Sequence, residues 1–190
     1  PNIIVLMSES FWDITRVKEL GFKEEMFPTY RNLQKTSLTG ELLTNVYNGG
    51  TVNSEFEAMT GFSVSYLPSE YMPYQRCLRP NFYSINSFLE SSGYDSLAIH
   101  PFEKTNYNRN AAYEYMDFDK TVWEDDFDAN ADRMRGYISD HALTEKIIEE
   151  YKKHKAESNS PWFNLSVSVQ NHGGYWESTL DKNKNCLLYT

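Results

Sequence analysis

Apolar residues along this chain follow two patterns, continuous runs and stripes with a helical period. Residues 2–8 (NIIVLMS) form a nearly continuous apolar run rich in Ile and Val. Such a run is typical of a strand buried on both faces, so it predicts a central strand of a parallel sheet. Comparable runs predict further strands at residues 40–47, 94–101 and 161–170.

Between these runs, apolar residues recur every three or four positions, which predicts helices. The predicted helices cover residues 28–37, 51–60, 82–92, 108–115 and 139–155. The expected inward-facing residues are Phe56 and Met59 in the second helix, Ile85, Phe88 and Leu89 in the third, and Leu143, Ile147, Ile148 and Tyr151 in the last. Residues 67–80 and 123–135 lack such a period and are predicted to be irregular.

The alternation of strands and helices predicts an α/β fold, a mostly parallel central sheet flanked by helices. A length of 190 residues fits one domain with a substantial core, and 40% hydrophobic residues is a globular composition. Neither a membrane-spanning apolar run nor a signal peptide is visible, and the chain begins directly with strand material, as an excised domain would.

Charge and cysteine usage exclude some classes of function. The formal net charge of -9 argues against nucleic acid as a partner, because phosphate-backbone binding needs clustered Lys and Arg. Cys77 and Cys186 lie far apart in the sequence, which suggests neither a zinc site nor a disulfide framework.

Polar residues of the types used in catalysis and ligand binding follow the predicted strands. Glu9, Thr51, His100 and His172 each come shortly after one of them. In open α/β sheets, ligands bind at the carboxyl ends of the strands, so these four residues are expected at one rim.

Each of these residues also has an ordinary structural interpretation. Glu9 is a possible ligand of a divalent cation or simply a solvated acid at a strand end. Thr51 follows Gly49-Gly50 at a helix start. Glycines there allow close approach of an anion to the helix N-terminus, but a threonine at that place is also an ordinary N-cap.

The segment 100–110 (HPFEKTNYNRN) places His100, Tyr107 and Arg109 in one strand-to-helix connection. Arginine binds phosphate in a bidentate manner and tyrosine offers a stacking face with a hydroxyl, although a solvated loop with Arg109 paired to one of the many acids explains the segment equally well. Three other acids are interpreted as structural. Glu55 and Glu57 complement the helix dipole, and Asp140 of the Asp140-His141 pair caps the last helix.

Taken together, these segments resemble the extracellular catalytic domain of the lipoteichoic acid synthase family, phosphoglycerol transferases within the alkaline phosphatase/sulfatase superfamily. The matching residues occur in order over almost the whole chain. They are Asn2-Ile3-Ile4 through Glu9-Ser10, Gly49-Gly50-Thr51 with Ser54-Glu55-Phe56, His100, Asn106 to Asn110, and Asn171-His172. The resemblance implies a sulfatase-like sandwich, of which residues 1–190 would be the N-terminal part.

The resemblance also implies a role for each candidate residue. Glu9 and Thr51 would bind Mn²⁺ or Mg²⁺, and Thr51 would be the catalytic nucleophile as well as the helix cap. His100, Arg109 and His172 would contact the phosphate or the glycerol. Tyr107 stands where the family often has Trp, and it would contact the substrate from that position.

The reaction implied by the resemblance is the transfer of phosphoglycerol from phosphatidylglycerol to a glycerolphosphate polymer or a glycolipid. It would take place on the outer face of the bacterial cytoplasmic membrane, with membrane attachment through segments absent from this chain. The family completes its metal site with a later Asp-His pair, which this sequence lacks. We therefore expect a C-terminally truncated domain that binds metal weakly and is itself inactive. Two alternatives stay open: a related phosphoethanolamine transferase or sulfatase-type hydrolase, and a catalytically inactive binding module.

Overall fold

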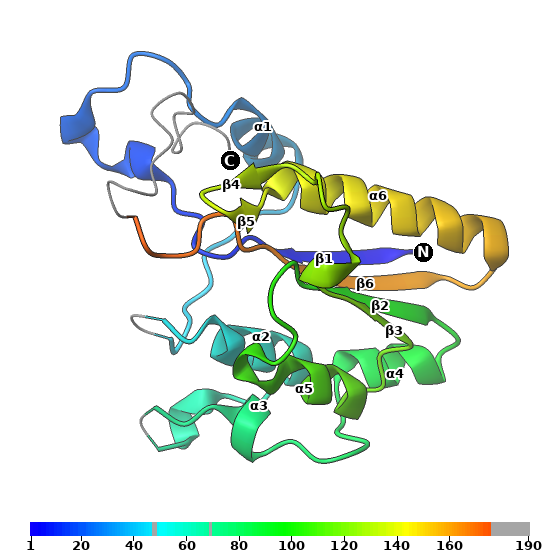
Figure 1. The fold of residues 1–190 in the computed structure, drawn as a ribbon. Coiled ribbons are helices and arrows are strands. Elements are labelled where there is room, and N and C mark those ends of the chain that lie inside the picture. Colours follow the sequence, from blue (N-terminus) through cyan, green and yellow to red (C-terminus); the bar gives the residue numbers. More distant parts are fainter. Residues whose placement is uncertain (47–48, 69, 176–190) are drawn as a thin grey trace.

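The computed structural model describes residues 1–46, 49–68 and 70–175, and they form a parallel sheet covered by helices (Figure 1). The sheet has the order β1-β6-β2-β3, with β1 at Ile3–Met7, β2 at Asp95–Ile99, β3 at Lys120–Val122 and β6 at Trp162–Val167. A separate antiparallel hairpin consists of β4 (Arg133–Met134) and β5 (Tyr137–Ile138). The helices are α1 (Pro28–Thr36), α2 (Thr51–Thr60), α3 (Pro73–Arg76), α4 (Ile85–Ser91), α5 (Arg109–Tyr115) and α6 (Asp140–Glu157). The predicted α/β fold is confirmed.

Helices cover the two faces of the sheet in separate layers. Helices α1 and α6 lie on one side and α2 to α5 on the other (Figure 1). The core beneath α6 joins Leu143 and Ile147 to β2, β3 and Trp162. The opposite core is larger and includes Val52, Phe56, Met59, Tyr74, Tyr113, Phe163 and Leu165. Alternate residues of β2 and β6 enter the two cores because successive side chains of a strand point to opposite faces.

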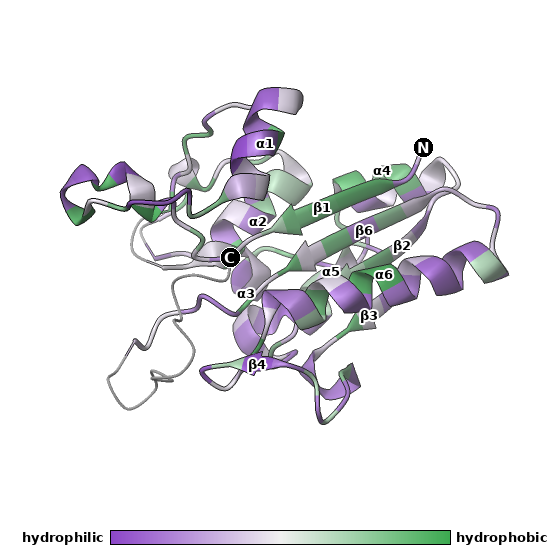
Figure 2. Cartoon of the chain, turned by 90° about the horizontal axis from the view of Figure 1, so that it is seen from above, coloured by the Kyte–Doolittle hydropathy of each residue, from purple (hydrophilic) through white to green (hydrophobic). Residues whose placement is uncertain are grey.

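The interior strands of the sheet are β6 and β2, and the central position predicted for residues 2–8 is wrong. Every residue of β6 is buried, whereas β1 pairs only with β6 and forms an edge of the described sheet. Along β1 burial alternates, so that Ile4 and Leu6 are 54% and 53% exposed. Figure 2 shows this strand as a continuous hydrophobic band. Its apolar composition predicted a strand correctly, but composition alone does not tell how many neighbours a strand has.

The strand predicted at residues 40–47 is also wrong. Residues 40–46 have no regular structure, and residue 47 lies outside the described ranges. The apolar side chains of this segment face solvent, with Leu42 88% and Leu43 94% exposed. A β-strand gains its stability from pairing and burial, and this apolar run has neither.

Helix positions agree with the prediction, but some details differ. Helix α4 starts at Ile85, because the Ser84 side chain caps it in a reciprocal box with Ser87. Of the predicted apolar face, only Leu89 is buried, while Ile85 and Phe88 are 42% and 53% exposed. In α6, Leu143 and Ile147 are buried as predicted, and Ile148 is 38% exposed.

The N-cap of α6 differs as well. It is Ser139, whose hydroxyl accepts from the Ala142 N–H, and not Asp140. The two segments predicted to be irregular contain short elements, α3 in the first and a 3₁₀ turn (Glu124–Asp126) with β4 in the second. Strand β3 was not predicted, because it has only three residues.

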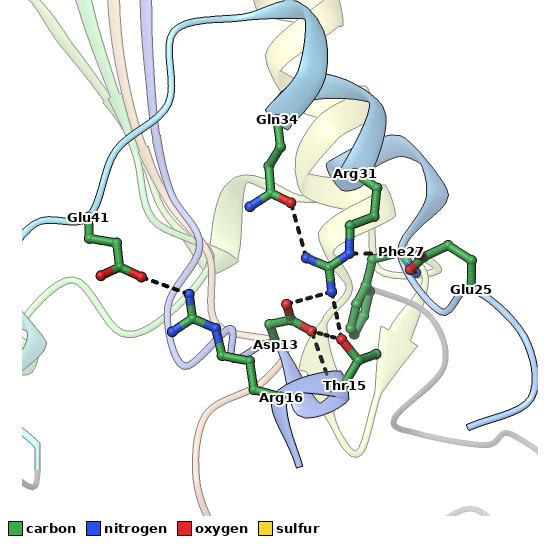
Figure 3. Close-up of polar contacts among 8 residues, drawn as sticks. All are labelled: Asp13, Thr15, Arg16, Glu25, Phe27, Arg31, Gln34 and Glu41. Carbon is green, nitrogen blue, oxygen red and sulfur yellow. Dashed lines mark hydrogen bonds and ion pairs between the residues drawn. The ribbon is translucent and has the colours of Figure 1, made fainter. Parts of the chain in front are cut away.

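The chain segment after β1 is fixed to α1 by a polar cluster (Figure 3). Arg31 Nη2 lies 2.6 Å from Asp13 Oδ2 and donates to the Thr15 hydroxyl at the same distance. Hydrogen bonds from Thr15 and the Arg31 guanidinium outweigh burial and hold the pKa of the Asp13 carboxyl below its usual value. The cluster therefore restrains the chain just beyond Glu9. Over the described ranges, no helix is both long and apolar enough to span a bilayer.

Candidate active site

The carboxyl ends of β1, β2 and β6 meet at one edge of the sheet because the three strands are parallel. Glu9 lies two residues beyond β1 and is 8% exposed. Its backbone N–H donates to the Ser168 hydroxyl at 3.0 Å, and the Ser168 N–H donates to the Met7 carbonyl. The neighbouring strand thus holds Glu9 at the rim, as the strand-end pattern predicted.

Thr51 reaches the same place from the start of α2. Gly49 and Gly50 have φ values of 102° and 77°, a left-handed conformation that glycine adopts without steric cost. Gly50 is the N-cap, so the expectation that Thr51 caps the helix is wrong. As the first helical residue, Thr51 has a hydroxyl that donates instead to Glu9 Oε1 at 2.9 Å. The two glycines therefore direct a hydroxyl to a carboxylate and do not merely begin a helix.

His100 follows β2 directly and is almost fully buried, with 1% exposure. Its Nδ1–H donates to the Val167 carbonyl at 3.0 Å, because a carbonyl can only accept. Burial, together with the positive charge of Arg109, lowers the pKa of the imidazole to about 3. His100 is therefore a neutral ring whose Nε2 is a hydrogen-bond acceptor at physiological pH.

Arg109 begins α5 and is equally buried, with 1% of its side chain exposed. The connection before it turns sharply, since Tyr107 and Asn108 have φ values of 54° and 63°. The Arg109 guanidinium carbon lies 5.5 Å from the centroid of the Tyr107 ring, within the range of a cation–π contact. Arg109 is therefore not solvated, but its expected pairing with an acid is confirmed, because Glu55 is its partner, and the structure also brings Arg109 and Tyr107 together.

Glu55 has the structural role that the sequence analysis gave it, but through buried side-chain partners and not through the helix dipole. Its Oε2 accepts from Arg109 Nε at 3.0 Å, and its Oε1 accepts from Tyr74 Oη at 3.1 Å and from Tyr113 Oη at 2.7 Å. Burial lowers the pKa of the Arg109 guanidinium, but the charge of Glu55 more than offsets this and raises it overall. Burial and that same charge raise the pKa of both tyrosines.

A periodic signal for Glu55 is present in the sequence. Val52, Glu55, Phe56 and Met59 follow the i, i+3, i+4, i+7 pattern of one helix face, and all four are buried. A carboxylate on the apolar face of a helix needs a buried partner, and Arg109 fills that place. Within the described chain, Arg109 Nη2 is a buried nitrogen with no hydrogen-bond partner.

His172 lies in the loop after β6 and is partly buried. Its ring stacks on Phe102 with centroids 6.2 Å apart, and it meets the Tyr137 ring edge-on at 5.7 Å. Phe102 also packs against the His100 ring, with centroids 6.0 Å apart, so both histidines contact the same aromatic side chain. The rim thus combines the Glu9–Thr51 pair with His100, Arg109 and His172.

The donor atoms that the rim residues offer show whether a divalent cation fits here. Glu9 and Thr51 offer a carboxylate and a hydroxyl oxygen, which are donors suited to Mg²⁺ or Mn²⁺. No group of three or more His, Cys, Asp or Glu that could hold a metal occurs among residues 1–46, 49–68 and 70–175. Both donor types of the Glu9–Thr51 pair suit such a cation, and the pair supplies two of the ligands that the cation would need.

Comparisons with known proteins give the family and the fold of this chain. Residues 1–186 match the family model described as Sulfatase. A putative cyclic beta-1,2-glucan modification protein of Rhizobium meliloti (strain 1021) is 39% identical over 184 residues, which cover 96% of this chain and 27% of that protein. The chain thus spans about a quarter of the length of this relative.

Two solved structures share the fold. The lipoteichoic acid synthase LtaP from Listeria monocytogenes superimposes with a TM-score of 0.75 at 22% identity, covering 90% of this chain and 41% of that one. The Streptococcus pyogenes phosphoglycerol transferase GacH, solved with sn-glycerol-1-phosphate, gives a TM-score of 0.72 at 22% identity, covering 99% and 52%. The fold and the family match together show that this chain belongs to the sulfatase family.

Proposed function

We propose that this chain carries the nucleophile of a metal-dependent phosphoglycerol transferase that uses phosphatidylglycerol as its donor. The observation that carries the proposal is the hydrogen bond from the Thr51 hydroxyl to Glu9 Oε1, at 2.9 Å. A threonine hydroxyl is a weak nucleophile until an adjacent group activates it. Here it is freed from helix capping and directed to a carboxylate at the ligand-binding edge of the sheet.

The reaction has two displacements at phosphorus. In the first, Thr51 Oγ1 attacks the phosphorus of phosphatidylglycerol, and the bond to the diacylglycerol oxygen breaks. Diacylglycerol leaves with a proton, and phosphoglycerol stays on Thr51 as a phosphate ester. In the second, an acceptor hydroxyl attacks the same phosphorus and Thr51 regains its proton. Bound Mn²⁺ or Mg²⁺, held by Glu9 and Thr51, would lower the pKa of the hydroxyl and neutralise charge on phosphate oxygens.

The other rim residues have complementary tasks in this scheme. Burial, together with the Arg109 charge, lowers the His100 pKa and keeps that imidazole neutral. In this proposal Arg109, although paired with Glu55, also balances the phosphate charge, and its buried Nη2, which has no partner among the described residues, donates to a phosphate oxygen once the substrate reaches it. His100 accepts from a glycerol hydroxyl through Nε2, and Tyr107 and His172 pack against the glycerol. A neutral imidazole suits a hydroxyl better than a phosphate, which refines the expected role of His100.

The proposed acceptor is a carbohydrate hydroxyl. The relative at 39% identity is named for modification of a cyclic beta-1,2-glucan, and GacH is described as a phosphoglycerol transferase. A sugar hydroxyl attacks phosphorus in the same way as the terminal hydroxyl of a glycerolphosphate polymer or glycolipid. Because the donor is a membrane lipid, we place the reaction at the outer face of the bacterial cytoplasmic membrane.

The test is a transfer assay with the full-length protein. Phosphatidylglycerol with a fluorescent acyl chain is incubated with Mn²⁺ and a beta-1,2-glucan. The two products measured are diacylglycerol and glucan that carries phosphoglycerol. Glucan-dependent formation of both products supports the proposal. Release of diacylglycerol with free glycerophosphate at the same rate without glucan would show a hydrolase instead. Absence of any product with a range of acceptors would support an inactive binding module.

A further inference from the structure

The β4–β5 hairpin contains an arginine at a position that disfavours it. Met134 pairs with Tyr137, so Arg135 and Gly136 form a two-residue turn. Both have positive φ, 53° for Arg135 and 90° for Gly136. Turns of this kind prefer Asn-Gly or Gly-Gly, because a Cβ atom with a long side chain is strained in the left-handed region. An arginine held there points to a task outside the hairpin.

The Arg135 side chain binds the loop that carries His172. Its Nη2 donates to the Gln170 carbonyl at 2.8 Å and to the His172 carbonyl at 2.9 Å. The Arg135 guanidinium carbon lies 3.9 Å from the centroid of the Tyr175 ring, a cation–π contact that attaches Arg135 to this loop a second time. One side chain thus holds both ends of the segment from Gln170 to His172.

The same hairpin also positions the His172 ring. Tyr137, two residues after Arg135, meets that ring edge-on at 5.7 Å, and Phe102 stacks on it at 6.2 Å. The backbone and the ring of His172 are therefore fixed separately, the first by Arg135 and the second by these two aromatic side chains. Moving the loop backbone would take the imidazole off both rings.

Two nitrogens of Arg135, Nε and Nη1, are buried and have no hydrogen-bond partner in the described part of the chain. A residue selected for stability alone would not combine a strained backbone with unpaired buried donors. We propose that Arg135 is a positioning residue, which holds the loop so that the His172 imidazole stays at the rim beside His100. The importance of this position for catalysis rests on the proposed function, but the positioning itself does not.

The test uses a substitution that improves the turn while removing the guanidinium. Arg135→Asn creates the preferred Asn-Gly turn, and Arg135→Lys keeps the charge but not the paired donors. Proteins labelled with ¹³C-histidine are compared by NMR, with the His172 imidazole signal assigned through His172→Gln. Arg16→Asn, which removes an exposed guanidinium paired with Glu41, is the control. The thermal midpoint of each variant is measured in parallel.

We expect Arg135→Asn to keep or raise the thermal midpoint while it shifts or broadens the His172 imidazole signal. Binding of sn-glycerol-1-phosphate should weaken about tenfold or more, since small displacements of a site residue have large effects. Arg135→Lys should also alter the His172 signal and weaken this binding. Arg16→Asn should change neither the signal nor the binding. An unchanged His172 signal in both Arg135 variants would overturn the inference. If the unmodified protein does not bind sn-glycerol-1-phosphate, the proposed function fails, while the NMR result still decides the role of Arg135.

Discussion

The hydroxyl of Thr51 donates a hydrogen bond to the carboxylate of Glu9 across 42 residues of sequence, with an oxygen–oxygen distance of 2.9 Å. Among the described residues, no other side-chain hydrogen bond or ion pair of Thr51 or Glu9 explains the contact. Gly50 caps the helix in place of Thr51, and Glu9 is held at the sheet edge through its backbone. This arrangement supports the proposal that the pair is part of a site.

Glu9 is the first residue to test by substitution. Glu9→Gln keeps the shape and an oxygen that can accept from Thr51, but it removes the negative charge that attracts a cation. We expect Mn²⁺ affinity to fall about 100-fold or more, with folding stability within about 1 kcal/mol of the unmodified protein. Calorimetric titration and thermal unfolding measure the two effects.

Glu41→Gln is the matched control for this change, since Glu41 is an exposed acid whose side chain is 86% accessible. It should leave Mn²⁺ affinity unaltered. Equal Mn²⁺ binding by Glu9→Gln and the unmodified protein would show that Glu9 is not a ligand.

Glu55 should matter chiefly for stability. Glu55→Ala leaves the Arg109 guanidinium charged and unpaired in a site where both side chains are 1% exposed. Breaking one partner of such a buried pair typically costs about 3 to 5 kcal/mol of unfolding free energy. Denaturant unfolding of the variant measures this loss.

Glu57 provides the comparison, because it lies two residues away in the same helix and is only partly buried. It accepts hydrogen bonds from Asn45, Ser63 and the Val64 N–H. We expect Glu57→Ala to cost about 1 to 3 kcal/mol. Equal losses for the two variants would argue against a special role for the Glu55–Arg109 pair.

The buried His100 should make stability depend on pH. Its pKa of about 3 lies below the ordinary value of 6.5, so the folded protein binds fewer protons than the unfolded chain between these limits. Stability should therefore fall as the pH is lowered through this window, by about 1.4 kcal/mol per pH unit from this residue alone. Above pH 6.5 the residue contributes no pH dependence.

Comparison with His100→Gln isolates this contribution from that of the carboxylates. The amide of Gln can still donate to the Val167 carbonyl, but it does not titrate. The difference in unfolding free energy between the two proteins should shrink steadily below pH 6. A difference that stays constant down to pH 4 would contradict the account, and His141→Gln, which removes an exposed histidine, controls for the loss of a ring.

The sequence predicted the positions of the site residues better than their surroundings. Glu9, His100 and His172 were found because parallel strands end at a common edge, and that rule depends only on where the strands lie. Residues 40–46 do not form the strand expected before Thr51, yet Thr51 reaches the same rim from the helix start. The pair of glycines was the more reliable signal, since it fixes the backbone directly.

Long-range burial was not predictable from local patterns. Glu55 was interpreted as a dipole-complementing acid because its partner, Arg109, is 54 residues away. The apolar runs of β1 and β6 look alike in sequence, and only the sheet order separates the edge strand from the central one. Arg135 gave no sequence signal, because its effect comes from contacts with a loop that begins 35 residues later.

The most direct test of the central claim is to look for phosphoglycerol on Thr51. The full-length protein is incubated with phosphatidylglycerol and Mn²⁺ without acceptor, and its peptides are analysed by mass spectrometry beside Thr51→Val, which keeps the side-chain shape. The account predicts one phosphoglycerol group on the peptide containing Thr51, its loss on adding glucan, and no diacylglycerol release by Thr51→Val. Diacylglycerol release by Thr51→Val at the unmodified rate would contradict it.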